Sequence, residues 1–220
     1  MAFDIEWWWD FQDRIEDQFG FSRIREDVAS RFASRIFTQE SDISVHVKDR
    51  DLVIVGAGIN SFTDIPESEL LVADGALRAC LERGTIPEFI VTDLDGYISD
   101  LIWASEHGSK VIMHSHGDNL AVQYRYSSYI SPICVTSTYP SKGTSCWGGF
   151  TDGDRALMML LSLGCKSVQL IGFDFSKIGD YSGKYSPRKL EKLAWAKKIV
   201  TECMQRSSSV SFANQKLLST

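Results

Sequence analysis

LLVADGALRACLERGTIPEFIVTDLDG, residues 70–96, contains two apolar runs of strand length separated by one helical segment. The first run covers residues 70–73, the second covers residues 88–92, and the helical segment covers residues 76–83. Parallel strands cannot be joined by a tight turn and need a crossover connection, which is usually a helix. The segment therefore predicts a βαβ unit of a parallel sheet.

The same alternation continues on both sides of this segment, from Asp51 onward. Further buried strands are expected at residues 52–56, 109–114, 133–136 and 167–172, with helices at 97–107, 119–128 and 152–163. A long polar helix at 187–205, with Pro187 in its first turn, precedes a last strand at 209–213, which we expect at a sheet edge. The pattern predicts a Rossmann-like α/β fold with a mainly parallel sheet and helices on both faces.

Residues 1–50 have a different character, with two amphipathic helices and no strand. The first helix has an apolar stripe that ends at an expected glycine C-cap: Trp8, Phe11 or Ile15, Phe19 and Gly20. The second is expected to begin after Ser22, and its stripe consists of Ile24, Val28, Phe32 and Ile36. We expect segment 1–50 to pack on the α/β domain at 51–220 or on a partner subunit, in at least a dimer.

The composition excludes several classes of partner. The chain has 220 residues, 23 basic and 29 acidic, for a net charge of −6, and contains no block of Lys or Arg. Binding to nucleic acid or to an anionic membrane through overall charge is therefore not expected. The chain also has no apolar run of about 18 residues and no basic leader. Its five scattered cysteines include no CxxC pair, which indicates a reducing cytoplasm rather than a disulfide or metal framework.

Aspartates gather just after the predicted strands. Of the 29 acidic residues 18 are Asp, and several of them follow strand ends: Asp74, Asp93, Asp95, Asp118, Asp152, Asp154 and Asp174. Ligands of open parallel sheets bind beyond the carboxyl ends of the strands. Asp93 and Asp95 form a D-x-D pair that suits Mg²⁺, although a turn capping the helix at 97–107 is the plainer interpretation. Asp74 and Asp118 at neighbouring strand ends favour the metal, because like charges repel unless a cation binds them.

Two loops have a possible role toward phosphate. Gly56, Gly58 and Asn60 follow the first strand in a G-x-G pattern whose third glycine is replaced by Ser61, so a phosphate-facing loop and a plain tight turn both remain open. Thr151 and Asp154 match a capping box at the start of a helix. Arg155 beside them would suit a polyphosphate.

His114 and His116 form an H-x-H pair. No third ligand at zinc-site spacing lies near them, so a zinc site is not favoured. Hydrogen bonding to substrate or phosphate is the preferred interpretation, and a structural histidine remains the alternative.

Six motifs, in this order, resemble those of the archaeal-type 6-hydroxymethyl-7,8-dihydropterin pyrophosphokinases, within the thiamine pyrophosphokinase superfamily. They are VGAGINS (55–61), ADGA (73–76), TDLDG (92–96), HSHGDN (114–119), GGFTDGDRA (148–156) and GFDFSKIGDYS (172–182). The N-terminal Trp-bearing helices fit the same family. The chain departs from the pattern at Ile59-Asn60-Ser61, where the family favours Pro-Ser, and at Glu88, where an Asp usually follows the proline.

The resemblance implies Mg²⁺-dependent transfer of diphosphate from ATP to the hydroxymethyl group of a reduced pterin, with release of AMP, in folate or tetrahydromethanopterin biosynthesis. It implies metal ligands among Asp74, Asp93, Asp95 and Asp118, with Asp93 and Asp95 central to catalysis and Asp118 as the base if one is used. ATP contacts are expected from Gly56, Gly58, Asn60, Asp74, Gly75, Asp152, Asp154 and Arg155. Acceptor contacts are expected from His114, His116 and Asn119.

Other functions also fit parts of the pattern. A thiamine pyrophosphokinase would share the superfamily motifs. A nucleotide-sugar glycosyltransferase would use D-x-D, but 220 residues leave no room for its acceptor-binding regions. A non-catalytic nucleotide-binding module is disfavoured by the intact acids, and an NAD-binding protein by the missing third glycine.

Overall fold

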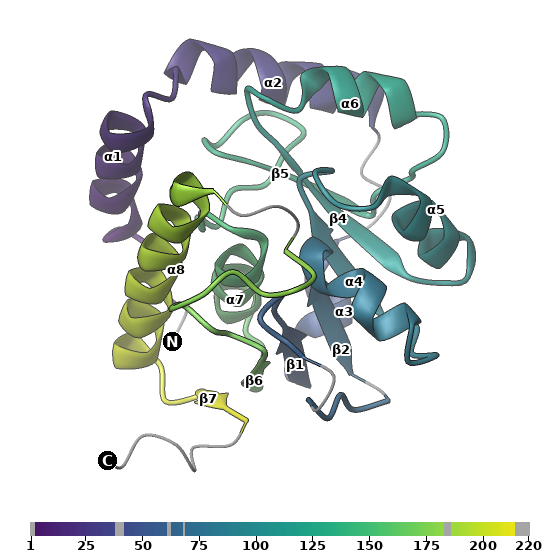
Figure 1. Ribbon diagram of the computed structural model, residues 1–220. Helices are drawn as coiled ribbons and strands as arrows, with labels where there is room; N and C mark the ends of the chain where they lie inside the picture. The colour runs from purple at the N-terminus through teal and green to yellow at the C-terminus, as the bar shows by residue number, and fades with distance from the viewer. Residues whose placement is uncertain (1–2, 38–41, 61–62, 68, 183–185, 214–220) are drawn as a thin grey trace.

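The computed structural model describes residues 3–37, 42–60, 63–67, 69–182 and 186–213. Its strands form one seven-stranded sheet in the order β5-β4-β3-β2-β1-β6-β7 (Figure 1). The strands are β1 Asp51–Val55, β2 Leu70–Ala73, β3 Phe89–Thr92, β4 Lys110–Ser115, β5 Cys134–Ser137, β6 Ser167–Ile171 and β7 Val210–Phe212. Every pair of neighbouring strands is parallel. The predicted α/β class is confirmed, and β7 lies at an edge as expected.

Helices cover both faces of this sheet. They are α1 Trp8–Phe19, α2 Arg23–Ile36, α3 Ser44–Val47, α4 Asp74–Leu81, α5 Ile98–Glu106, α6 Leu120–Tyr126, α7 Asp152–Ser162 and α8 Pro187–Arg206. Successive strand residues point to opposite faces, so Leu71 joins the apolar core under α7 and α8, and Val72 joins the core under α4 and α5. The apolar runs of β2 and β3 are therefore buried on both faces.

The order of the strands creates a crevice. The chain moves outward from β1 to β5, and α7 then leads it back to β6, which pairs with the other side of β1. Loops that leave the ends of β1 and β6 therefore diverge. Ligands of such sheets bind at this kind of switch point.

The N-terminal helix α1 agrees with its prediction. Trp8 and Ile15 are buried in the core, and the helix ends at Gly20 with a left-handed φ of 67°. The Trp195 indole on α8 donates to the Gln18 side chain, so α1 lies against α8 (Figure 1). No helix in the described part of the chain is long and apolar enough to cross a membrane. The proposed division at residue 50 stays a prediction.

Of the two alternatives for the apolar stripe of α2, packing on the α/β domain does not hold for its first two turns. Ile24 and Val28 are 78% and 51% exposed, and the buried face of the helix consists of Glu26, Ala29, Ser30 and Ala33. Small side chains on this face let the helix backbone approach the sheet, and the Ser115 hydroxyl on β4 donates to the Ala29 carbonyl over 2.9 Å. Ser22 precedes the helix, but its side chain makes no capping hydrogen bond. Ile24 and Val28 therefore face outward, whereas Ile36 packs against the core, and the helix lies beside α6 (Figure 1).

Candidate active site

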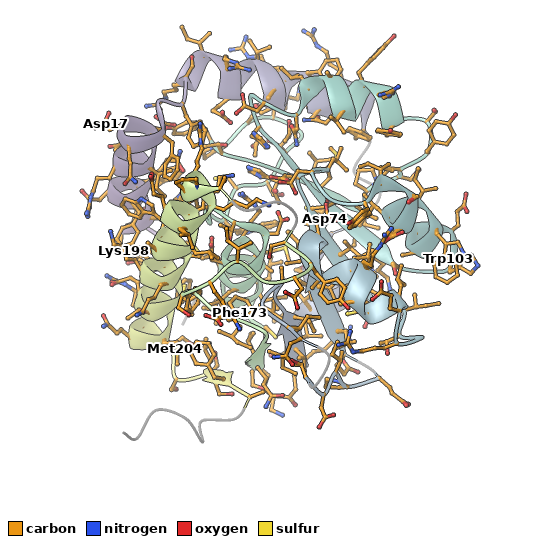
Figure 2. All side chains as sticks on the ribbon, viewed as in Figure 1. Asp17, Asp74, Trp103, Phe173, Lys198 and Met204 are labelled. Carbon is orange, nitrogen blue, oxygen red and sulfur yellow. The ribbon has the colours of Figure 1, made fainter. Side chains whose placement is uncertain are left out.

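Four carboxylates meet at the carboxyl ends of the central strands. Asp74 begins α4, Asp93 and Asp95 follow β3, and Asp152 begins α7. One oxygen of each lies within 4.8 Å of the others. Figure 2 labels Asp74 in the interior of the molecule, whereas Trp103 on α5 points outward. We call Asp74, Asp93, Asp95 and Asp152 the carboxylate cluster.

The turn after β3 is built to hold Asp74. The Asp74 carboxylate accepts hydrogen bonds from the Thr92 hydroxyl, at 2.5 Å, and from the Gly96 backbone N–H, at 3.2 Å. A Cβ on Gly96 would lie 2.3 Å from an Asp74 oxygen, so only glycine fits this position. Leu94 takes a left-handed φ of 68° to complete the turn. The TDLDG motif thus fixes one carboxylate and presents two others.

Protonation of the cluster reflects its crowding. Burial and the neighbouring Asp93 and Asp95 charges raise the pKa of Asp74 to about 7. Burial and the Asp93 charge raise the pKa of Asp95 to about 6, and burial raises that of Asp152 well above its ordinary value. Burial also favours neutral Asp93, but His116, whose Nε2 lies 3.6 Å from Asp93 Oδ2, lowers the pKa of Asp93 to about 2. A crowded carboxylate cluster of this kind favours binding of a cation in place of its protons.

Asp118 is not part of the cluster, and Asp152 takes the place expected for it. The Asp118 carboxylate lies 3.0 Å from Arg25 Nη2 on the surface, and its side chain is 54% exposed. This corrects the expected metal set. Asp152 was predicted only as an ATP contact, because the sequence does not show that α7 returns the chain to the centre of the sheet.

Glycines line a cavity beside the cluster. Gly56 and Gly58 lie so close to the β6 loop that a Cβ on either would come within 2.8 Å or 2.7 Å of the Gly172 carbonyl oxygen. We call this space the glycine-lined cavity; its walls include Gly56, Gly58, Gly75, Asp93, Asp95, Asp152, Gly172, Phe173, Lys177, Lys189 and Lys192. The first loop is thus a tight turn that borders a cavity, and the phosphate-facing interpretation stays a prediction.

Asn60 has a local role in the same loop. Its backbone N–H donates to the Thr63 hydroxyl, and its carbonyl accepts from Arg83. Asn60 is not among the residues that line the cavity. Ser61 lies outside the described residues.

Three lysines of the glycine-lined cavity were not predicted from the sequence. Lys177 follows β6, and Lys189 and Lys192 lie on α8. Their i,i+3 spacing places Lys189 and Lys192 on one side of the helix. This spacing was the only sign in the sequence that the two lysines could act together. Nothing in the sequence indicates that this side of α8 borders the cavity.

A second cavity adjoins the first and shares Asp93, Phe150 and Lys192 with it. We call it the second cavity; its remaining walls are Gln12, Ile15, Phe21, Glu26, His114, His116, Thr138, Gly149 and Arg155. The predicted residues His114, His116 and Arg155 thus come together here. Gln12, Phe21 and Glu26, from the N-terminal helical segment, were not anticipated.

Arg155 and His114 are held by the walls of this cavity. Arg155 donates from Nη1 to the Gly149 carbonyl at 3.0 Å and from Nη2 to the Phe150 carbonyl at 3.1 Å. His114 Nδ1 lies 2.9 Å from the Thr136 hydroxyl oxygen. Burial, with the nearby Arg155 charge, lowers the pKa of His114 well below its ordinary value. The His114 ring is therefore neutral.

Two predicted ligand contacts serve the framework instead. Asp154 forms the expected capping box of α7, accepting from the Thr151 hydroxyl at 2.6 Å, and it lines neither cavity. The Asn119 side-chain amide donates to the Asp93 carbonyl at 2.7 Å and to the His114 carbonyl at 2.8 Å, and its oxygen accepts from the His116 N–H. Asn119 therefore joins the loops after β3 and β4.

Comparisons with known proteins agree on one family. The model of a family described as "6-hydroxymethylpterin diphosphokinase MptE-like" matches residues 33–180. A relative in Methanothermobacter thermautotrophicus, named 6-hydroxymethyl-7,8-dihydropterin pyrophosphokinase, is 31% identical over 94% of this chain and 97% of its own. Relatives of the same name are 33% identical in Pyrococcus furiosus, over 89% of this chain and 92% of theirs, and 30% identical in Methanocaldococcus jannaschii, over 90% and 94%.

Proposed function

Because the chain belongs to the 6-hydroxymethylpterin diphosphokinase MptE-like family, we propose that it transfers diphosphate from ATP to the hydroxymethyl group of 6-hydroxymethyl-7,8-dihydropterin. One observation supports this most directly. The carboxylate cluster borders the glycine-lined cavity, and Asp93 also lines the second cavity. A donor and an acceptor bound in these two spaces would meet at Asp93.

The balanced reaction defines what the site must do. The hydroxymethyl oxygen attacks the β-phosphorus of ATP, the bond from that phosphorus to the α–β bridging oxygen breaks, and AMP leaves with the electron pair. The hydroxyl proton passes to solvent. Negative charge grows on the bridging oxygen, so positioning and charge neutralisation supply most of the catalysis.

The residues present fit a magnesium ion. Asp74, Asp93, Asp95 and Asp152 offer only oxygen donors, within 4.8 Å of one another, and Mg²⁺ prefers such ligands. When held by these carboxylates, Mg²⁺ would supply positive charge that neutralises the charge developing on the leaving group. Burial, and after it the neighbouring Asp93 charge, raises the pKa values of Asp74 and Asp95, and a bound cation would relieve the repulsion between the carboxylates.

The glycine-lined cavity suits the nucleotide. Because Gly56, Gly58 and Gly75 have no side chains, a nucleotide can approach the backbone of these loops closely. Lys189 and Lys192 supply positive charge at the cluster, and both act on Asp95 electrostatically. We therefore assign to the lysines the phosphate contacts that the sequence suggested for Arg155.

Activity can be tested directly. Purified protein is incubated with ATP, Mg²⁺ and 6-hydroxymethyl-7,8-dihydropterin, and the products are separated by chromatography and identified by ³¹P NMR. AMP and the pterin diphosphate should form in equal amounts. Formation of ADP, or no turnover, would overturn the proposal. Thiamine in a parallel reaction tests the sister activity of the superfamily.

We also propose that the chain forms a homodimer in the cytoplasm. Ile24 and Val28 on α2 and Tyr124 on α6 are exposed, and these two helices pack side by side. A second copy would cover this apolar surface. All five cysteines are free, which suits a reducing compartment.

A further inference from the structure

The second cavity contains polar groups that diphosphate transfer does not require. Gln12 and Glu26 come from α1 and α2, and Phe21 from the connection between them. Figure 1 shows these helices wrapping around the sheet near α8. A structural role alone does not explain why a carboxylate lines a cavity on this side of the molecule.

Glu26 is buried, although glutamate side chains are usually exposed. It is 7% exposed, whereas Ile24, two residues earlier on the same helix, is 78% exposed. Its Oε1 accepts from the Gly117 backbone N–H at 3.1 Å, and its Oε2 accepts from the Thr138 hydroxyl at 2.8 Å. No cation lies in salt-bridge range of Glu26 among the described residues. Burial of a carboxylate without a cation is unfavourable unless hydrogen bonds compensate.

The Glu26 carboxylate can accept further hydrogen bonds. An ionised carboxylate has about four acceptor positions, and the two hydrogen bonds above occupy one on each oxygen. Because Glu26 lines the cavity, the remaining position on each oxygen is available to a ligand with two adjacent N–H donors.

The same cavity offers a donor group and aromatic surface. Arg155 is also 7% exposed, and its Nε has no hydrogen-bond partner among the described residues. Phe21 and Phe150 line the cavity as well. A ligand that fits is flat and aromatic, with two N–H donors on one edge and a carbonyl acceptor nearby.

We propose that the second cavity binds the fused ring of the acceptor and that Glu26 recognises its 2-amino-4-oxopyrimidine edge. The two Glu26 oxygens accept from the 2-amino group and the adjacent ring N–H in parallel, and Arg155 donates to the 4-oxo oxygen. This inference rests on the proposed function and names the group that selects its acceptor. We assign the nucleotide to the neighbouring cavity, because Lys177, Lys189 and Lys192 all line it, whereas the second cavity combines Lys192 and Arg155 with the Glu26 carboxylate.

Glu26→Gln tests the assignment with little change of shape. The glutamine oxygen can still accept from the Gly117 N–H, and its amide can donate to the Thr138 hydroxyl oxygen. Wild type and variant are compared on the 2-amino acceptor, 6-hydroxymethyl-7,8-dihydropterin, and on its 2-oxo analogue, 6-hydroxymethyl-7,8-dihydrolumazine. A site built around hydrogen bonds to a substrate N–H rejects an analogue that lacks it.

We expect Glu26→Gln to raise KM for the pterin by at least about tenfold and to reduce the preference for the 2-amino over the 2-oxo acceptor by at least about tenfold. KM for ATP should stay within about twofold, because Glu26 does not line the glycine-lined cavity. Asp27→Asn is the matched control: it removes one charge from the same helix at an exposed position that pairs with Arg31.

Unchanged KM and unchanged acceptor preference in Glu26→Gln, with an active wild type, would overturn the inference. If the variant does not fold, Glu26→Asp keeps the charge, withdraws it by one methylene, and should show the same selective loss of pterin affinity. Binding of 6-hydroxymethylpterin without ATP, followed by tryptophan fluorescence, separates the two proposals. If the wild type is inactive but binds this pterin, and Glu26→Gln weakens the binding, only the proposed function is contradicted. If the wild type does not bind this pterin, the inference is contradicted.

Discussion

Thr92 donates its hydroxyl hydrogen to the Asp74 carboxylate over 2.5 Å, which ties the end of β3 to the first turn of α4. The same hydroxyl oxygen accepts from the Leu94 backbone N–H at 2.8 Å. One buried hydroxyl group thus fixes both the position of Asp74 and the turn that presents Asp93 and Asp95. Such fixed carboxylates bind a cation without first losing conformational freedom.

Asp93→Asn and Asp95→Asn should each lower kcat by at least about 10²-fold, or about 2.7 kcal/mol of transition-state stabilisation. Each removes one anionic ligand from the carboxylate cluster. Release of AMP from ATP in the presence of the pterin is the measurement. Asp118→Asn is the control, because Asp118 pairs with Arg25 outside the cluster, and its kcat should stay within about threefold of wild type. Near-normal turnover in both cluster variants would mean that these carboxylates only stabilise the turn after β3, where Asp93 accepts from the Asp95 backbone N–H.

Magnesium should stabilise the protein more at pH 8 than at pH 5. The folded-state pKa values of Asp74, about 7, and Asp95, about 6, lie above the ordinary value of an aspartate. Between about pH 4 and pH 7 the metal-free folded chain therefore binds more protons than the unfolded chain, and its stability falls as the pH rises. At pH 8 Mg²⁺ relieves this repulsion without competition from protons.

Thermal unfolding with and without Mg²⁺ at the two pH values is the measurement. The increase in Tm should be larger at pH 8, and Asp152→Asn should reduce it. An equal shift at both pH values, retained in Asp152→Asn, would show that the ion binds elsewhere.

Gly58→Ala should weaken nucleotide binding. Its Cβ would lie 2.7 Å from the Gly172 carbonyl oxygen and 2.8 Å from the Asp174 backbone nitrogen, so the β1 and β6 loops must move apart. We expect Kd for a non-hydrolysable ATP analogue to rise at least about tenfold, as measured by calorimetry. Gly84→Ala serves for comparison: its φ of 74° makes alanine unfavourable by about 1 kcal/mol, but no atom lies near its Cβ, and nucleotide affinity should not change.

Lys192→Met should lower kcat/KM by at least about tenfold while the protein remains folded. Lys192 lines both cavities, and its charge acts on Asp93 and Asp95. Methionine keeps most of the apolar stem, which isolates the charge. Lys197→Met, on an exposed part of the same helix, should behave as wild type. Equal steady-state rates for the two variants would remove Lys192 from the mechanism.

Val28→Glu should convert a dimer into monomers. Val28 is 51% exposed on the outward stripe of α2, where a charge costs little in the isolated chain but opposes an apolar interface. Light scattering after size exclusion measures the mass of both proteins. A wild type that stays monomeric at high concentration contradicts the proposed dimer.

The sheet could be predicted well from the sequence, for a physical reason. Strands such as Leu70–Ala73 and Phe89–Thr92 are buried on both faces, so they form nearly unbroken apolar runs between polar loops. The short helix α3, Ser44–Val47, was not predicted, because four residues contain too little periodicity. The side of α2 that faces the sheet could not be predicted from the sequence. Alanines and a glutamate occupy that side, and hydrophobicity alone favours the opposite one.

The candidate site was predictable only in part. Asp74, Asp93 and Asp95 follow adjacent strands, so the topology brings them together. Asp118 follows the next strand, and only the position of Arg25 on a distant helix decides that its side chain points elsewhere. Glu26 and Lys192 come from helices packed on the rim of the sheet, and their inward orientation depends on tertiary contacts that no local pattern specifies.

Of the two cavities, only the second includes residues of the N-terminal helices. All four cluster carboxylates come from the stretch between β2 and α7, whereas Gln12 and Glu26 precede β1. If Glu26 selects the acceptor as proposed, the first two helices can diverge while the cluster carboxylates are preserved. A descendant that kept the middle of the chain and remodelled its first two helices would inherit the reaction and acquire a new alcohol to modify.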